Sequence, residues 1–229
     1  MAENLTAEER KPVNKKAVIF DLDGTLSDSI HSIKYCADRA LKPLGFGPFT
    51  EEDYKYFVGD GAANLIRRAL AAGGDKDGLY FQETFDRYKE LFAVDCMYEV
   101  KPYDGIKELL NALKERGIKL AVLSNKPHAE TIRVIESLFG EDVFDILHGQ
   151  IEGVPIKPDP AGVFRIMEQL SLEPGEILYL GDTATDMKTG KGAGLFTIGA
   201  LWGFRKREEL EENHADAIIG HPLEMLNYI

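Results

Sequence analysis

The sequence predicts an α/β fold, in which a doubly wound, Rossmann-like parallel sheet forms the core and an all-helical cap domain is inserted into it. Short runs rich in Val, Ile and Leu alternate with stretches whose apolar residues recur at the spacing of one helix face. One long interval, residues 28–97, breaks this alternation, because it carries helical patterns without a convincing strand.

The apolar runs are typical of strands that are buried on both faces of a parallel sheet. Strands are expected at residues 17–20, 118–123, 143–147, 177–180, 195–198 and 217–219. Helices are expected between them, because apolar residues three and four positions apart lie on one helix face. These stripes are Ile106, Leu109, Leu110 and Leu113; Ile132, Ile135 and Phe139; and Val163, Ile166, Met167 and Leu170.

The helical interval carries three further stripes, which begin at Ile30, Ala62 and Phe81. Because this interval follows the first strand directly, it is expected to form a cap over the carboxyl edge of the sheet. The predicted organisation is a flexible leader at 1–15, an α/β core at 16–27 and 98–229, and a helical cap at 28–97.

Charge and composition exclude several functional classes. Asp and Glu number 39 against 27 Lys and Arg, and the net charge of −12 argues against nucleic-acid binding. Two cysteines, Cys36 and Cys96, are too few for a disulfide scaffold and favour a reducing compartment. Because no segment resembles a signal peptide or a membrane helix, we expect a cytoplasmic protein without membrane contact. Monomer and homodimer both remain open.

Two carboxylates stand where the first predicted strand ends, in Asp21-Leu22-Asp23-Gly24-Thr25. A divalent cation would keep both ionised at this sheet edge, although the same residues are also typical of an Asx turn with a helix cap. Polar residues at the ends of other strands favour the functional interpretation. They are Ser124, Asn125 and Lys126 after one strand, and Gly181, Asp182 and Asp186 after another.

Together with Lys157, which lies in a proline-rich loop, these residues resemble the four motifs of the haloacid dehalogenase superfamily. The matching motifs are Asp21-x-Asp23-Gly24-Thr25, Ser124, Lys157 and Gly181-Asp182-x-x-x-Asp186. Their order and spacing span nearly the whole chain. The resemblance also implies a helical cap inserted just after the first motif.

The resemblance implies a catalytic set of four residues. Asp21 would be the nucleophile that attacks phosphorus and forms an aspartyl-phosphate, and Asp23 would serve as acid and then base. Ser124 and Lys157 would contact the phosphoryl oxygens and the nucleophile.

A Mg²⁺ cofactor is implied by the same resemblance. Carboxylate and carbonyl oxygens are hard ligands that favour Mg²⁺ over Zn²⁺. The expected metal residues are Asp21, Asp23 through its backbone carbonyl, Asp182 and Asp186, although Asp186 is also consistent with an ordinary surface acid on a helix.

The segment around Gly59-Asp60-Gly61, like Ser124-Asn125-Lys126, resembles the phosphoglycolate phosphatases, with Asp60 in place of an expected Asn. Free amides at the following helix start would suit an anionic part of a substrate, although the glycines are equally typical of a plain helix start. Arg67 and Arg68 point about 100° apart, so at most one faces a ligand. Candidate substrate-binding residues are Gly24, Thr25, Asn125, Lys126, Gly59, Gly61 and Arg68.

The sequence therefore predicts a Mg²⁺-dependent phosphatase of a small phosphorylated metabolite, most like the phosphoglycolate phosphatases. A phosphomutase of the β-phosphoglucomutase kind shares the same core residues and remains open. A phosphonatase would need a cap lysine that forms a Schiff base, and a non-catalytic phospho-binding module would retain the fold without turnover.

Overall fold

The computed structural model describes residues 15–229, and the predicted leader lies outside the described residues except for Lys15. Lys15 is buried at the amino end of the sheet instead of belonging to a flexible segment. Its ammonium donates hydrogen bonds to the backbone carbonyls of Gly175 and Ile177. These two carbonyls provide the hydrogen-bond acceptors that a buried ammonium requires, so Lys15 can be part of the folded core.

Within residues 15–229, six parallel strands form one sheet in the order β5-β4-β1-β6-β7-β8. β1 lies at the centre, between β4 and β6, where the strand order reverses direction. This is the place where open α/β sheets bind ligands, just beyond the carboxyl ends of the strands. The strands are β1 Ala17–Phe20, β4 Lys119–Pro127, β5 Ile146–Gln150, β6 Ile177–Gly181, β7 Phe196–Ala200 and β8 Ala217–Ile219.

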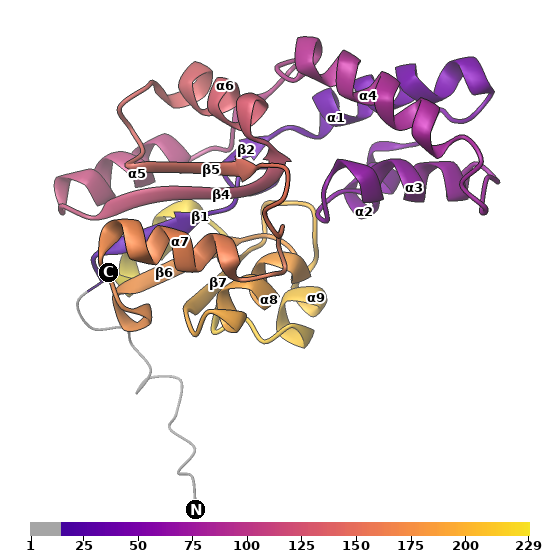
Figure 1. Ribbon diagram of the computed structural model, residues 1–229. Coiled ribbons are helices and arrows are strands. Elements are labelled where there is room, and N and C mark those ends of the chain that lie inside the picture. Colours follow the sequence, from indigo (N-terminus) through magenta and orange to yellow (C-terminus); the bar gives the residue numbers. More distant parts are fainter. Residues whose placement is uncertain (1–14) are drawn as a thin grey trace, which may run out of the picture.

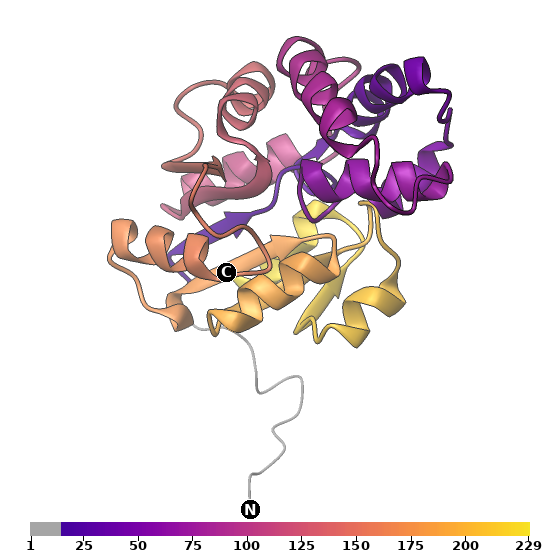
Figure 2. The same cartoon turned by 45° about the vertical axis from the view of Figure 1, so that its right-hand side comes forward.

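Helices cover both faces of this sheet, which confirms the predicted fold class (Figure 2). Successive residues of β1 face opposite layers: Val18 and Phe20 pack in one hydrophobic cluster, and Ala17 and Ile19 pack in the other. One layer holds α5 Ile106–Glu115, α6 His128–Phe139 and the 3₁₀ segment Pro222–Tyr228, and the other holds α7 Ala161–Leu170 and α8 Ala184–Gly192. The short helix α9 Arg207–Glu212 follows β7.

Four helices between β1 and α5 pack around a hydrophobic cluster of their own, beyond the carboxyl ends of the strands (Figure 1). They are α1 Ile30–Leu41, α2 Glu51–Phe57, α3 Ala62–Ala72 and α4 Phe81–Asp95. We call these helices and their connections the cap. Two short antiparallel strands, β2 Ser27–Asp28 and β3 Lys101–Pro102, join it to the core.

The apolar stripes of the sequence form the buried faces of most of these helices, but α2 carries no such stripe. It begins with a capping box, in which Thr50 and Asp53 satisfy each other's backbone amides. Tyr54 of α2 is fully buried and donates its hydroxyl to Asp38 at 2.8 Å. Among the described helices, none combines the length and the apolar character needed to cross a membrane.

Candidate active site

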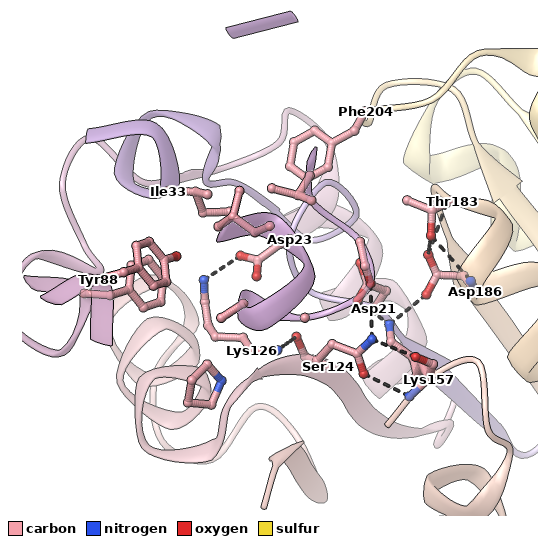
Figure 3. Close-up of a pocket in the computed structure, with 18 residues that line it drawn as sticks. Asp21, Asp23, Ile33, Tyr88, Ser124, Lys126, Lys157, Thr183, Asp186 and Phe204 are labelled. Carbon is pink, nitrogen blue, oxygen red and sulfur yellow. Dashed lines mark hydrogen bonds and ion pairs between the residues drawn. The ribbon is translucent and has the colours of Figure 1, made fainter. Parts of the chain in front are cut away.

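Asp21 lies at the centre of a buried charge cluster at the carboxyl edge of the sheet (Figure 3). Its amide donates to the carbonyl of Leu180 in β6 at 2.9 Å, so the strand ladder continues one residue past β1. Lys157 Nζ lies 2.6 Å from Asp21 Oδ1 and 2.7 Å from Asp186 Oδ1. Because all three residues are at most 6% exposed, one buried ammonium joins a carboxylate at the end of β1 to one in the first turn of α8.

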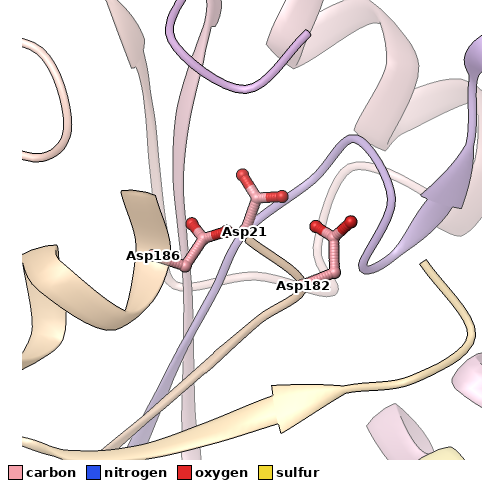
Figure 4. Close-up of side chains that lie close together, drawn as sticks. All are labelled: Asp21, Asp182 and Asp186. Atoms are coloured by element: carbon pink, nitrogen blue, oxygen red, sulfur yellow. The ribbon is translucent and has the colours of Figure 1, made fainter. Parts of the chain in front are cut away.

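A third carboxylate completes an acidic group. Oxygens of Asp21, Asp182 and Asp186 all lie within 4.8 Å of one another (Figure 4). Asp182 follows β6 and accepts hydrogen bonds from the amide of Phe204 at 2.7 Å and the hydroxyl of Thr25 at 3.1 Å. Buried carboxylate oxygens converging from several loops are the donor set that suits Mg²⁺.

The electrostatics of this group favour a bound cation. Burial raises the pKa of Asp21 to about 7, with Lys157 opposing the rise and Asp186 adding to it. Burial and the charges of Asp21 and Asp186 raise the pKa of Asp182 well above its ordinary value. Burial also disfavours the Lys157 ammonium, but the flanking carboxylates outweigh it and raise its pKa. Three carboxylates against one ammonium leave an excess of negative charge that a divalent ion would neutralise.

Asp186 is held in place by a capping box at the start of α8. Its Oδ2 accepts from the Thr183 amide at 3.1 Å and from the Thr183 hydroxyl at 2.7 Å, and Thr183 Oγ1 accepts from the Asp186 amide. The hydroxyl of Tyr179 also donates to Asp186, at 3.3 Å. The sequence analysis missed Thr183, although Thr183-x-x-Asp186 is a recognisable capping signal.

Thr183→Ala is expected to cost about 1 kcal/mol of stability, the usual cost of a lost helix cap, and to lower kcat/KM roughly tenfold. The loss of activity follows because Asp186 loses its hydroxyl and its fixed orientation. The matched control is Thr50→Ala, which removes the same kind of cap from α2, away from the site. Denaturant unfolding and kinetics of both variants provide the test; equal losses of activity would mean that Thr183 acts through stability alone.

Asp23 and Ser124 lie beside Asp21 and line the same cavity. Lys126 Nζ lies 2.7 Å from Asp23 Oδ1 and 4.8 Å from the centre of the Phe92 ring in the cap. The Lys126 amide donates to Ser124 Oγ at 3.1 Å. Since this hydroxyl already accepts a hydrogen bond, its own proton is available to a ligand oxygen.

Asn125 joins three parts of the site. Its side-chain amide donates to the carbonyls of Lys157 at 3.0 Å and Gly59 at 3.1 Å, and its oxygen accepts from the Lys157 amide at 2.9 Å. Asn125, Gly59 and Gly61 all line the cavity, as expected for substrate-binding candidates. The Asn125 side chain, however, is engaged by the protein itself and fixes the Lys157 loop against the cap.

Three other substrate-binding candidates lie elsewhere. Arg68 pairs with Asp60 and donates to the carbonyl of Phe57 at 2.9 Å, so it does not line the cavity. Gly24 and Thr25 lie behind the cavity wall. A Cβ on Gly24 would come within 2.4 Å of Asp182 Oδ2, and Thr25 is fully buried, so both residues position the carboxylates.

Asp60 is neutralised at the contact between cap and core. Its carboxylate accepts from the hydroxyl of Thr185 in α8 and from Arg68. Burial opposes ionisation of Asp60, but these two hydrogen bonds and the charge of Arg68 prevail and lower its pKa. The extra acid noted in the sequence therefore faces the interface instead of the cavity.

The cap wall of the cavity could not be identified from the sequence. It consists of Ile33, Val58, Ala62, Leu65, Tyr88 and Phe92, and the core loop adds Phe204. In the sequence, these residues are indistinguishable from the apolar stripes that fill the cap interior. Within the described part of the chain, the lysines that line the cavity are Lys126 and Lys157, and both come from core loops.

Comparisons with family models, with known sequences and with solved structures all point to the same protein family. Residues 18–200 match the model of the haloacid dehalogenase-like hydrolases. The phosphoglycolate phosphatase of Aquifex aeolicus is 34% identical over 191 residues, which cover 83% of this chain and 87% of the relative. That of Vibrio vulnificus is 32% identical over 222 residues, covering 93% and 96%. The crystal structure of a predicted phosphoglycolate phosphatase from Haemophilus somnus has a TM-score of 0.85 at 25% identity, covering 93% and 96% of the two chains.

Proposed function

The chain belongs to the haloacid dehalogenase-like hydrolase family and is a phosphatase, and from this premise we propose that it hydrolyses 2-phosphoglycolate through an aspartyl-phosphate on Asp21, with Mg²⁺ as cofactor. The observation that carries the chemistry is the buried contact of Lys157 with Asp21 and Asp186. The choice of substrate is supported by relatives named phosphoglycolate phosphatases, which match along most of their length.

In the first step, a carboxylate oxygen of Asp21 attacks phosphorus, and the bond between phosphorus and the leaving oxygen breaks. Asp23 gives its proton to that leaving oxygen, so glycolate departs with a neutral hydroxyl. In the second step, water attacks the phosphorus of the aspartyl-phosphate while Asp23 takes a proton from that water. Inorganic phosphate leaves, and Asp21 and Asp23 return to their starting states.

Lys157 and Ser124 serve the phosphoryl group during both steps. The Lys157 ammonium offsets the negative charge that Asp21 and the phosphoryl oxygens bring together, and the Ser124 hydroxyl donates to one of those oxygens. Mg²⁺, when held by Asp21, Asp182, Asp186 and the carbonyl of Asp23, supplies further positive charge for the same purpose. Fixed donors in a buried site act strongly because little water competes with them.

We expect Mg²⁺ to raise the melting temperature more at about pH 8 than at about pH 5.5. The pKa of Asp21 is raised to about 7 in the folded protein, whereas its ordinary value, which applies to the unfolded chain, is about 3.9. Between these two pH values, the folded protein holds a proton that the unfolded chain has released. The metal-free protein therefore loses stability as the pH rises from about 4 to about 7. Because Mg²⁺ binds the ionised carboxylates, it recovers this loss at the higher pH. Thermal unfolding with Mg²⁺ or EDTA at both pH values provides the test.

The control for this experiment is Asp182→Asn, which removes one of the crowded carboxylates. Without metal, the variant is expected to melt above the wild type, because the repulsion among the three acids is relieved. Mg²⁺ is expected to leave its melting temperature unchanged. A full Mg²⁺-induced rise in this variant would exclude Asp182 as a metal residue.

The function itself is tested by phosphate release from 2-phosphoglycolate, sugar phosphates, nucleoside monophosphates and pyrophosphate, each with Mg²⁺ or EDTA. We expect the highest kcat/KM for 2-phosphoglycolate and no turnover in EDTA. A higher value for another compound would overturn the substrate. Interconversion of sugar monophosphates primed by a sugar bisphosphate would instead indicate the phosphomutase.

A further inference from the structure

The cap side of the cavity is apolar except at one side chain. The described cap residues that line it offer aliphatic or aromatic groups and the backbone of Gly59 and Gly61, and among their side chains only Tyr88 carries a hydrogen-bonding group. In Figure 3, the hydroxyl of Tyr88 lies on the side of the ring that faces Lys126 and Asp23. Whatever part of a substrate extends from the phosphoryl site toward the cap meets this hydroxyl.

Tyr88 is 3% exposed, and no hydrogen bond joins its hydroxyl to a described residue. The oxygen is not among the fully buried polar atoms that lack a partner, so it is accessible from the cavity. A ligand that covers this hydroxyl without offering an acceptor leaves it unsatisfied, which weakens binding. The ring is held by Phe92, whose ring centre lies 5.2 Å away at an interplanar angle of 17°. Burial, with a smaller contribution from Cys36, raises the pKa of Tyr88 well above its ordinary value, so the group stays a donor. The position of the ring is fixed, and the hydroxyl is left to the cavity by the described residues.

Two features near this hydroxyl, an ammonium and a helix start, suit a negatively charged acceptor. The Lys126 ammonium lies over the Phe92 ring, next to Tyr88, and it is paired with Asp23, whose charge also raises the pKa of Tyr88. α3 begins after Gly61, and Ala62 in its first turn lines the cavity, so its free amides and positive dipole end face the same space. Asp60, the acid beside that helix start, is paired with Arg68 and accepts a hydrogen bond from the Thr185 hydroxyl.

We propose that Tyr88 is a specificity-determining residue, whose hydroxyl donates a hydrogen bond to the carboxylate of the substrate's leaving group. This assignment rests on the proposed function and adds to it the residue that distinguishes a phosphorylated hydroxy acid from a simple alkyl phosphate. The apolar walls around Tyr88 make the distinction strong, because in the absence of the carboxylate the buried donor stays unsatisfied.

The test compares two substrates that differ only at this group, 2-phosphoglycolate and ethyl phosphate, in which a methyl replaces the carboxylate. Wild-type protein is expected to favour 2-phosphoglycolate in kcat/KM. Tyr88→Phe removes only the hydroxyl oxygen, and it is expected to lower the ratio of the two kcat/KM values roughly 10- to 100-fold, the range for a hydrogen bond to a charged group. The ratio is the readout, because general damage to the site lowers both values together.

Tyr54→Phe is the matched control. Tyr54 is another buried cap tyrosine, but its hydroxyl donates to Asp38 and lies outside the cavity, so its removal is expected to leave the ratio unchanged. An unchanged ratio in Tyr88→Phe, with a wild type that favours 2-phosphoglycolate, would overturn this assignment and leave the proposed function standing. A wild type that does not favour 2-phosphoglycolate would overturn both.

Discussion

Asp21→Asn is expected to lower kcat by roughly 10⁴-fold or more, since removal of a catalytic nucleophile leaves only binding and electrostatic contributions. The neutral amide cannot attack phosphorus, but it has the same shape as the carboxylate. Its Oδ1 can still accept from Lys157, now 2.6 Å from the Asp21 oxygen. The fold is therefore expected to persist, and the variant is expected to trap no acid-stable phosphorylated protein.

The matched control for this variant is Asp142→Asn, which makes the same chemical change at an exposed position on the loop before β5. Steady-state phosphate release and circular dichroism of both variants provide the comparison. Turnover within about tenfold of the wild type in folded Asp21→Asn would place the nucleophile at another residue.

Lys157→Ala is expected to lower kcat/KM by about 10² or more and also to destabilise the metal-free protein. Lys157 is 4% exposed and holds Asp21 and Asp186 together. Without its ammonium, two buried carboxylates lack a partner, and the loss of one member of a buried pair typically costs about 3–5 kcal/mol. The destabilisation is expected to shrink toward about pH 5, because the pKa of Asp21 is raised to about 7 and this carboxyl carries a proton at the lower pH.

Denaturant unfolding in EDTA across this pH range measures the effect, and Lys188→Ala is the control. Lys188 is exposed on α8, the helix that carries Asp186, so its loss changes the net charge equally without touching the cluster. If both variants lost the same stability and kept wild-type rates, the contacts of Lys157 with Asp21 and Asp186 would serve neither stability nor catalysis.

The central strands β1 and β6 were predictable because they are buried on both faces and therefore consist largely of consecutive apolar residues. The edge strand β5 is only partly buried, and it begins at Ile146 instead of at residue 143. β1 matches its apolar run at both ends, whereas β4 extends to Pro127, through the polar residues that belong to the site. α2 was not predicted, because its seven residues are too few to show a helical period. The sequence indicates this helix only at its start, where Thr50 and Asp53 have the spacing of a capping box.

The core residues of the site were recognisable because a parallel sheet brings the carboxyl ends of its strands to one edge. Asp21, Ser124, Lys157 and Asp186 are far apart in sequence, yet all line the same cavity. The cap residues were not recognisable in this way. Arg68 was a plausible ligand by charge, but its partner is Asp60, while Tyr88 had the pattern of an interior residue.

The order of apolar runs thus predicted the fold class, because burial and backbone hydrogen bonding repeat along each strand and helix. The spacing of the polar motifs predicted the family and the candidate catalytic residues, because the carboxyl ends of parallel strands meet at one edge of the sheet. The tertiary structure decided which side chains face the cavity from the cap. Which cap side chains face the cavity depends on the orientation in which helices such as α3 and α4 pack against their neighbours. It also depends on which charged side chains pair with each other, as Asp60 and Arg68 do. These are long-range contacts, and no local pattern in the sequence records them.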